Sequence, residues 1–390
     1  MPRNLLFVGD LACTTGFGRV NEELLTRIDR TVFTPHVLGI NASGDPHPLR
    51  ERLHIYPARE DGHPYGVNRF ASLVDAVKPA LVVIHQDAWI VPAYLEAAES
   101  VGVKLPPVIA YCPPDSPNQP AGVKLRVQKL LCPTQFGVDE LRKGGYSGSA
   151  AVLPYGVDTT KFFPEDQTEA RKLLGFPERF THGFVVGRAD RNAQRKRYDL
   201  TIGGWRLWWD AAGRPDTAAL QLNCVPHEAI GWDLPQLTLY YGIKTQVLFS
   251  VDRETRADRL PPSEVLRHVY NTWDAHLSTV HGEGHGLVAH ESAACRVPQI
   301  LPRYAAYGEI WKDAALFMEP AAHHVHTAGI NTVGGVVRVE DVAEAIMQFY
   351  SYESLRLSLS GKAFNRATES RYDWARIAQQ FQQHCEEVTA

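Results

Sequence analysis

The strongest indication of the fold is the stretch HLSTVHGEGHGLVAHESAACRVPQI, residues 276–300 of the 390-residue chain. An apolar run ends near Val280, a glycine-rich turn covers 282–286, a helical pattern follows over 286–295, and VPQILP (297–302) predicts the next strand. The backbone N–H groups at the start of such a helix have no partner within the helix, and the helix dipole adds positive potential there. Because glycine lets the backbone come close to a phosphate, the turn predicts an anion-binding site.

Strand and helix patterns alternate along most of the chain. Apolar runs predict strands at 4–9, 80–85, 106–111, 127–133, 184–188, 219–225, 245–251 and 275–280. Helical spacing predicts helices at 18–29, 90–101, 136–145 and 197–211, and over most of the tail after about residue 339. Continuous apolar strands that alternate with helices favour an α/β fold with parallel sheets covered on both faces.

The segment AVLPYGVDTTKFFPE (151–165) interrupts this alternation with turn residues and prolines, and we interpret it as the connection between two domains. We expect an N-terminal Rossmann-like domain over 1–157 and a C-terminal Rossmann-like domain over 158–370. A final helix over 371–390 is expected to pack back on the N-terminal domain.

Composition excludes several classes of protein. The net charge of −4 and pI of about 6.5 argue against a general electrostatic grip on nucleic acid, and we see no membrane-docking signal. Six scattered cysteines without a Cys-x-x-Cys pair predict buried thiols in a reducing compartment. The first apolar run is too short for a signal peptide or a spanning helix, so we expect a cytoplasmic, soluble protein.

Two glutamates, Glu283 in the turn and Glu291 in the helix, lie eight positions apart. With Gly282-Glu283-Gly284-His285-Gly286-Leu287 around them, the stretch resembles family 4 glycosyltransferases, retaining enzymes of the GT-B fold whose hallmark is Glu-x7-Glu. The resemblance covers nearly the whole chain. It implies two Rossmann-like domains whose parallel sheets face each other across a cleft. The alternative is a glycine-rich connection with two surface glutamates. The donor-binding residues that the resemblance implies here are Gly284, His285, Gly286, Leu287 and Glu291.

A second segment, FVVGRADRNAQRKRYDLTI (184–202), has a strand, a cationic loop and a helix. Such charge suits a diphosphate, whose oxygens arginine can bind in pairs. The segment resembles the family's donor loop, in which one Arg and one Lys bind the diphosphate. Lys196 matches the Lys, and either Arg188 or Arg191 matches the Arg. A solvated run of charges is the alternative.

The first glycine-rich turn, Thr14-Thr15-Gly16-Phe17-Gly18-Arg19, meets neither the dinucleotide nor the P-loop spacing. It resembles the family's N-terminal loop, which implies that Gly16 approaches the donor phosphate and the acceptor. A tight turn between strand and helix that needs glycine is the alternative.

Two residues are candidates for the acceptor side. Many family members place a His after the strand that matches 106–111, where this chain has Cys112-Pro113-Pro114-Asp115. Asp115 either takes that place as a polar partner or base, or it caps the loop. His85 ends the preceding strand, where it either lines the acceptor cleft or is structural.

No metal site and no cofactor are expected. No Asp-x-Asp occurs, which disfavours a metal-dependent donor site. His281, His285 and His290 lack the spacing and the Cys or carboxylate company of a zinc site, and we interpret 323–326 as a loop run.

The predicted function is retaining transfer of a sugar from a UDP- or GDP-sugar to an acceptor hydroxyl. The resemblance implies that Lys196, one arginine and the N–H groups at 284–287 stabilise the leaving diphosphate, and that Glu283 holds the sugar or acts near C1. The acceptor is a polysaccharide, a lipid, a protein or a modified nucleobase. A nucleotide-sugar epimerase, a phosphorylase and a non-catalytic nucleotide-sugar-binding subunit remain alternatives.

Overall fold

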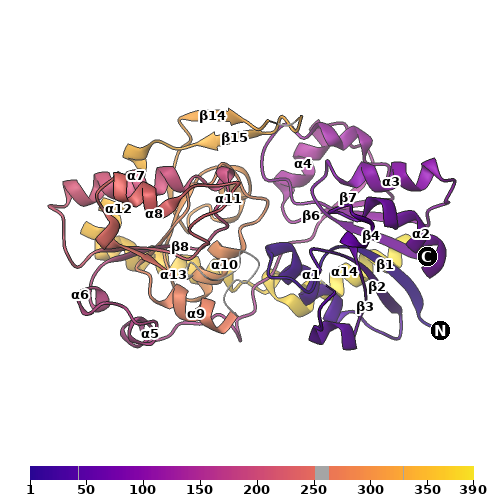
Figure 1. Ribbon diagram of the computed structural model, residues 1–390, viewed down its shortest axis with the longest axis horizontal. Helices are drawn as coiled ribbons and strands as arrows, with labels where there is room; N and C mark the ends of the chain where they lie inside the picture. Colours follow the sequence, from indigo (N-terminus) through magenta and orange to yellow (C-terminus); the bar gives the residue numbers. More distant parts are fainter. Residues whose placement is uncertain (43, 251–262, 328) are drawn as a thin grey trace. The chain divides into compact units, whose positions relative to one another are not determined.

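The structure, a computed structural model, describes residues 1–390 except 43, 251–262 and 328 (Figure 1). The chain forms two compact units. Unit 1 comprises Met1–Gly156, Ala328–Thr332 and Ser370–Ala390, and unit 2 comprises Val157–Thr327 and Val333–Glu369. Each unit is built on a parallel sheet, of seven and six strands respectively, so the predicted α/β fold of two parallel-sheet domains is confirmed.

Unit 1 has a parallel sheet in the order β3-β2-β1-β4-β5-β6-β7. Its strands are β1 (Arg3–Asp10), β2 (Phe33–Ile40), β3 (His54–Pro57), β4 (Leu81–His85), β5 (Val108–Tyr111), β6 (Lys129–Cys132) and β7 (Ser149–Val152). Its helices are α1 (Gly16–Arg27), α2 (Val67–Val77), α3 (Val91–Ser100), α4 (Gln135–Lys143) and α14 (Trp374–Thr389), with short turns η1 (Pro48–Glu51), η2 (Ala58–Asp61), η3 (Pro120–Lys124) and η6 (Ser370–Tyr372).

Both faces of this sheet are covered, as the residues of β1 show. Leu6 and Val8 belong to the core formed with α2, α3 and α4. Phe7 points to the opposite face, because side chains alternate along a strand. There its ring meets Phe381 of α14 edge to face, with centroids 6.3 Å apart. The C-terminal helix is therefore part of unit 1.

Unit 2 has a parallel sheet in the order β10-β9-β8-β11-β12-β13, and a separate antiparallel hairpin. The strands are β8 (Val185–Arg188), β9 (Ala219–Leu222), β10 (Val247–Phe249), β11 (Ala275–Leu277), β12 (Gln299–Pro302) and β13 (Leu316–Met318), and the hairpin is β14 (Ala322–Val325) with β15 (Val333–Val336). The helices are α5 (Gln167–Leu173), α6 (Glu178–Thr181), α7 (Tyr198–Ala211), α8 (Leu234–Tyr240), α9 (Ser263–Asn271), α10 (Leu287–Ala294), α11 (Ala305–Ile310), α12 (Val339–Ser351) and α13 (Glu353–Ala367), with turns η4 (Gln194–Lys196) and η5 (Lys244–Gln246). The strand predicted at 245–251 is β10, and its last residue lies outside the described residues.

One prediction in this unit is wrong. The histidine run 323–326 is not a loop run, since His323 and His324 lie in β14 and pair with Gly335 and Gly334 of β15. Histidine has no strong strand preference, and a two-glycine partner strand gives no apolar alternation to detect.

The core of unit 2 is aromatic. Trp205 and Trp208 of α7 are fully buried, so the tryptophans of this helix serve packing. Gly204 lets α12 approach closely, because a Cβ atom there would lie 2.3 Å from a methyl carbon of Val342. The helix α7 thus packs against α12 through a glycine and keeps its indoles for the interior.

In each unit, the strand order places two loops next to each other at the carboxyl ends of two central strands. From β1 the chain builds outward to β2 and β3, and then resumes at β4 on the other side. The same change of direction separates β8 from β11 in unit 2. In open α/β sheets the carboxyl ends of strands at such a switch point are where ligands bind. The loops that follow β8 and β11 are therefore the place to look for a site in unit 2.

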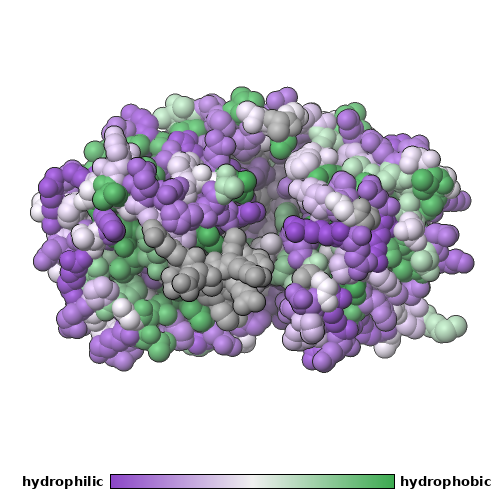
Figure 2. All heavy atoms as spheres, viewed as in Figure 1, coloured by the Kyte–Doolittle hydropathy of each residue, from purple (hydrophilic) through white to green (hydrophobic). Residues whose placement is uncertain are grey.

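Within the described residues, no helix is both long enough and apolar enough to cross a lipid bilayer. Hydrophilic and hydrophobic side chains are interspersed over the visible face of both units (Figure 2). All six cysteines are free thiols, and every one except Cys13 is buried.

Candidate functional site

The loops after β8 and β11 are joined by hydrogen bonds. The N–H of His281 donates to the carbonyl oxygen of Arg195 at 2.9 Å, and the Arg195 guanidinium donates to the carbonyl oxygen of Gly282 at 3.3 Å. The cationic loop and the glycine-rich turn, which are more than eighty positions apart in sequence, therefore lie side by side at the switch point.

Lys196 is the centre of this junction. Its Nζ forms ion pairs with Asp190 Oδ1 at 2.7 Å and with the carboxylate of Glu283. Arg195 adds a second cation, with its Nη1 3.9 Å from Glu283 Oε1. Burial alone would raise the pKa of Asp190, but the charges of Lys196 and Arg188 outweigh it and hold that pKa well below its usual value. The ammonium is thus kept in place by two carboxylates, those of Asp190 and Glu283.

The start of α10 presents backbone donors next to this junction. Gly286 precedes the helix with φ +89°, and a Cβ atom there would lie 2.3 Å from the ring of Tyr307. Among the described residues, no side chain caps the helix, and the first-turn N–H groups from Leu287 onward have no acceptor within it. Glu283 is anchored just before this point, because its carbonyl oxygen accepts from the Ala306 N–H at 3.1 Å. The helix predicted at 286–295 is confirmed as α10, and its start can hold an anion.

Glu291 lies deeper in unit 2. Its side chain is buried, and Oε2 accepts a hydrogen bond of 2.7 Å from the hydroxyl of Tyr270 in α9. His285 is also buried, with its ring stacked on His290 at 4.3 Å between centroids. The side chain of His285 is therefore used for packing, and only its backbone belongs to the glycine-rich turn.

The arginines of the donor loop have different surroundings. Arg188 is fully buried, and its guanidinium donates to Thr201 at 2.5 Å, to Thr279 at 2.6 Å and to the Lys196 carbonyl. Its Nε also pairs with Asp190 at 3.2 Å. All of its nitrogens are therefore used inside unit 2, which makes Arg188 a support for the loop.

Arg191 points away from that interior. Its side chain is 67% exposed, and it pairs with Glu228 at 3.0 Å. Arg195 is the arginine that contacts Glu283, and sequence reasoning did not single it out. The available signal was its position directly before Lys196 in a short 3₁₀ turn.

In unit 1 the first glycine-rich turn is built around a carboxylate. Gly16 is exposed at the start of α1, and Thr15 caps the helix by accepting from the Gly18 N–H at 3.0 Å. The Thr15 hydroxyl donates to Asp10 Oδ2 at 2.6 Å, and the amide of Asn41 donates to the same oxygen at 3.2 Å. Burial raises the pKa of Asp10. Sequence reasoning missed Asp10, although an acidic residue that ends an apolar strand was visible.

The two acceptor-side candidates differ in exposure. His85 is fully buried, its Nδ1 pairs with Asn21 and its Nε2 lies 2.7 Å from the Tyr155 hydroxyl. Burial lowers the pKa of His85 to about 3, so the ring is neutral. Asp115 is half-buried in the loop that follows β5. Of the two, only Asp115 has a side chain within reach of solvent.

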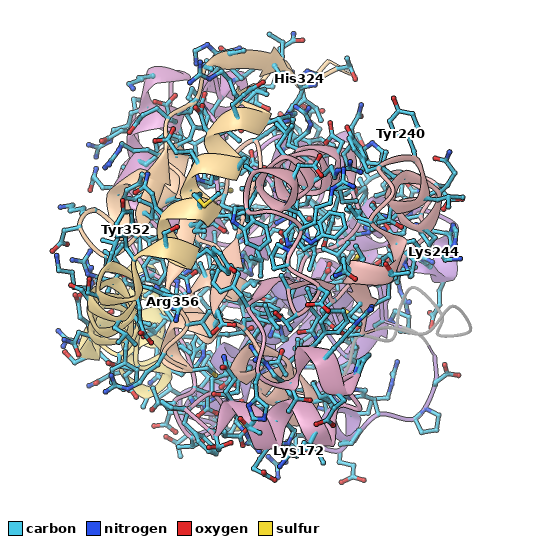
Figure 3. All side chains as sticks on the ribbon, turned by 90° about the vertical axis from the view of Figure 1, so that its left-hand side faces the viewer. Lys172, Tyr240, Lys244, His324, Tyr352 and Arg356 are labelled. Carbon is cyan, nitrogen blue, oxygen red and sulfur yellow. The ribbon has the colours of Figure 1, made fainter. Side chains whose placement is uncertain are left out.

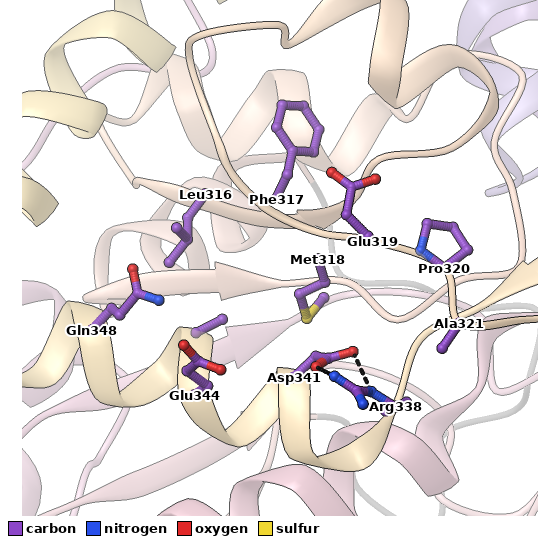
Figure 4. A pocket seen from close by; sticks show the side chains of 11 residues that line it. Leu316, Phe317, Met318, Glu319, Pro320, Ala321, Arg338, Asp341, Glu344 and Gln348 are labelled. Atoms are coloured by element: carbon purple, nitrogen blue, oxygen red, sulfur yellow. Dashed lines mark hydrogen bonds and ion pairs between the residues drawn. The ribbon is translucent and has the colours of Figure 1, made fainter.

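A cavity elsewhere in unit 2 contains none of these residues. It has a volume of about 370 Å³ and lies between β13 and the start of α12. Figure 4 shows Phe317, Glu319 and Glu344 around it, and the ion pair between Arg338 and Asp341 at its rim. The paired charges at the rim leave no cluster of uncompensated cations there, so the anion site remains the one at the switch point.

Comparison with known proteins finds glycosyltransferases. No protein-family model matches the sequence. The chain is 28% identical over 269 residues to a D-inositol 3-phosphate glycosyltransferase from Actinosynnema mirum, which covers 64% of this chain and 56% of that protein. It is 31% identical over 156 residues to the enzyme of the same name from Geodermatophilus obscurus, covering 38% and 32%. The chain thus spans about half, or less, of the length of these curated relatives.

Solved structures match over the full length. Sucrose-phosphate synthase from Thermosynechococcus elongatus superposes with a TM-score of 0.72 at 15% identity, covering 100% of this chain and 99% of that one. The glycosyltransferase WaaG gives 0.70 at 12% identity, covering 97% and 99%. Anabaena HepE in complex with UDP-glucose gives 0.69 at 15% identity, covering 99% and 100%. The chain therefore has the GT-B fold, and its relatives are glycosyltransferases of that type.

Proposed function

We propose that this chain is a retaining glycosyltransferase that moves a sugar from a UDP- or GDP-sugar to an acceptor hydroxyl without a metal ion. One observation carries the proposal. Lys196 and Arg195 lie against Glu283 directly before the open start of α10, at the switch point of the unit 2 sheet. Two cations and a helix start together match the charge of a nucleoside diphosphate.

The residues divide the work as follows. The ammonium of Lys196 exchanges its contact with Glu283 for the diphosphate, while Asp190 keeps it oriented from the other side. Arg195 and the N–H groups from Gly284 to Leu287 bind the remaining oxygens. These donors stabilise the charge that develops on the leaving group. A bound metal ion has that role in other transferases.

Glu283, once released from Lys196, accepts hydrogen bonds from hydroxyls of the transferred sugar. Glu291 binds the ribose through its carboxylate, which Tyr270 already orients. The acceptor binds unit 1, where Gly16 lies in the first glycine-rich turn and Asp115 is the candidate for a polar partner or base. His85 has a structural role, because it holds Tyr155 and Asn21 in position. The acceptor is a hydroxyl of a polysaccharide, a lipid, a protein or a modified nucleobase.

The relatives support a nucleotide-sugar donor. Two of them carry the name D-inositol 3-phosphate glycosyltransferase, and a structural neighbour was solved with UDP-glucose. The identity to that neighbour is 15%, so the donor class, a nucleoside diphosphate sugar, is inferred from the chemistry of the site.

The experiment uses the purified chain with a panel of UDP- and GDP-sugars and measures release of the nucleoside diphosphate, with and without EDTA. We expect release from at least one donor by slow transfer of the sugar to water, unchanged by EDTA. The anomeric configuration of the freshly released sugar, read by NMR before it mutarotates, should equal that of the donor. Lys196→Ala should lower turnover at least about a hundredfold, since removing one preorganised donor of this kind costs that much. An inverted product, or a rate that EDTA abolishes, would contradict the corresponding part of the proposal.

The matched control is Lys172→Ala. Lys172 is exposed in the same unit, where it pairs with Glu169, and Figure 3 shows it at the outer edge of that unit. It should leave turnover unchanged. Binding of a nucleotide sugar with no release would instead identify a non-catalytic binding subunit, and conversion of the donor alone into an isomer would identify an epimerase.

A further inference from the structure

Three imidazoles from separate parts of the sequence meet in unit 2. His281 follows β11, His324 lies in β14, and His326 comes directly after that strand. One ring nitrogen from each residue lies within 4.8 Å of the others. The rings of His281 and His324 are 4.8 Å apart between centroids, and His281 Nδ1 lies 3.3 Å from His326 Nε2.

The backbone of the hairpin holds these rings together. The N–H of Gly335 donates to the carbonyl oxygen of His281 at 2.7 Å. A Cβ atom at Gly334 would lie 2.7 Å from the Cβ of His281 and 3.2 Å from His326 Nε2, so only glycine lets the hairpin close at this point. The close approach of β15 to His281 is thus a built feature of the fold.

The strand period selects which histidines take part. Side chains two positions apart share a face, so His324 and His326 point to the same side. His323 points to the other side, where its ring lies 6.2 Å from that of Tyr304. Figure 3 shows His324 on the hairpin at the outer edge of unit 2, where solvent reaches it.

We propose that His281, His324 and His326 form a binding site for one transition-metal ion of the Zn²⁺ class. The ligand set is three imidazoles without a carboxylate, which suits Zn²⁺, Co²⁺, Ni²⁺ or Cu²⁺ and not Mg²⁺ or Ca²⁺. Zinc–nitrogen bonds of about 2.0–2.1 Å need the three nitrogens to draw closer than they lie now, by side-chain rotation. His324 and His326 are half-buried, so their rings are partly exposed to solvent. Solvent supplies the fourth ligand.

Arg197 opposes the metal and sets the affinity. Its guanidinium lies 3.0 Å from His281 Nε2 and donates there, so the ring proton of His281 is on Nδ1, facing His326. A metal on Nδ1 moves that proton to Nε2, which can then no longer accept from Arg197. Asp199, which accepts from Arg197 at 2.8 Å, retains the displaced guanidinium and offsets the added positive charge.

The site has a structural consequence. A bound ion links the β14–β15 hairpin to the residue that precedes Gly282 and Glu283 in the glycine-rich turn. The ion therefore fixes the position of the hairpin, and it is independent of the proposed transfer reaction, which uses no metal ion.

The test uses the untagged full-length chain, stripped with EDTA and dialysed. ZnCl₂ is titrated by calorimetry, bound zinc is counted by elemental analysis after a second dialysis, and Co²⁺ replaces Zn²⁺ for visible spectroscopy. We expect one ion per chain and the d–d bands of cobalt with nitrogen ligands. His324→Ala should weaken zinc binding by more than about tenfold, since even partners outside the ligand sphere are worth that much.

Two further variants make the test specific. His323→Ala, on the opposite face of the same strand, should bind zinc as the unaltered chain does. Arg197→Met should bind it several-fold more tightly, because it removes a neighbouring cation and the competing donor. Equal zinc binding by His324→Ala and the unaltered chain, or no stoichiometric binding by either the unaltered chain or Arg197→Met, would overturn the proposal.

Discussion

Lys196 and Arg188 show how differently two neighbouring cations of one loop are used. The guanidinium of Arg188 donates hydrogen bonds to Thr201, to Thr279 and to a backbone carbonyl inside unit 2. In the described part of the chain, the partners of the Lys196 ammonium are two carboxylates, one of which, Glu283, belongs to the glycine-rich turn. An anionic ligand can replace a carboxylate at an ammonium, but it cannot replace a buried network around a guanidinium without unfolding the loop.

The first prediction separates structure from binding at this loop. Arg188→Met should destabilise the fold by about 3–5 kcal/mol, since removing one partner of a buried ion pair leaves the other charge uncompensated. Arg195→Ala should leave stability unchanged and weaken binding of a nucleoside diphosphate about tenfold or more, because a charge-assisted hydrogen bond is lost. Urea unfolding followed by circular dichroism, together with calorimetric titration of UDP and GDP, measures both. A stable Arg188→Met that has lost only nucleotide affinity would reverse the two roles.

The sequence predicted the two loops of the site but not the roles of their arginines. Lys196 and Glu283 could be chosen from their motifs, and the structure brings them together. Choosing among Arg188, Arg191 and Arg195 depends on which guanidinium is buried, and burial is a property of the packed unit. Arg188 ends a fully buried strand, whereas Arg191 is exposed.

At the scale of the element, α10 depends on the glycine at its start. Gly286 has φ +89° and leaves no room for a side chain, because Tyr307 of α11 fills the space where a Cβ atom would be. Gly213, which follows α7, has a similar φ of +78° but no atom within 4 Å of its Cβ position. The two glycines therefore share the backbone constraint and differ only in packing.

The second prediction uses that pair. Gly213→Ala should cost about 1–2 kcal/mol of stability from the left-handed backbone alone. Gly286→Ala should cost about 1–3 kcal/mol more, because the methyl group overpacks against Tyr307, and it should also weaken nucleotide binding by turning the first N–H groups of α10. Thermal unfolding and nucleotide titration of both variants provide the measurement. Equal stability losses would mean that Tyr307 yields without cost.

Elements with an apolar period were predictable, and those without one were not. The runs at 4–9 and 80–85 are β1 and β4, which form the centre of the unit 1 sheet and are buried on both faces. β14, with two histidines, and β15, with two glycines, form a hairpin whose residues are held by backbone pairing and by Gly334 against His281. The contact of Gly334 with His281 joins residues more than fifty positions apart in sequence, so the local pattern carries no trace of it.

At the scale of the whole molecule, buried neutral histidines make stability depend on pH. Burial lowers the pKa of His85 in unit 1 to about 3 and that of His276 in unit 2 to about 4. Between about pH 6.5 and 4 the unfolded chain binds protons at these residues and the folded chain does not. Their contribution is complete above about pH 6.5 and is lost as the pH falls. Asp190, whose pKa is also lowered, loses its contribution only at pH values below its ordinary range.

The third prediction follows from that sign. The free energy of unfolding should fall by up to about 1.4 kcal/mol per pH unit for each of these histidines as the pH is lowered from 6.5 to 4. His276→Gln should reduce the slope of the unfolding free energy against pH by the amount that corresponds to about one proton. Urea titrations at several pH values measure the slope, and an identical slope for His276→Gln and the unaltered chain would contradict the assignment.

The chain closes on itself through α14, which completes unit 1 although it follows unit 2 in sequence. Its buried residues Trp374, Ile377, Phe381 and Cys385 form one stripe, and Phe381 packs on Phe7 of β1. Phe381→Ala should therefore destabilise unit 1 by about 3–5 kcal/mol, whereas Gln383→Ala on the exposed side should change stability by less than about 0.5 kcal/mol. Hydrogen exchange resolved by peptide should show the loss of protection in β1 and α1, while the core of unit 2 keeps its protection. The reason is that a cavity beneath Phe7 must weaken the unit 1 sheet that contains Phe7. Faster exchange confined to unit 2 would contradict this and would show that α14 stabilises unit 2 instead.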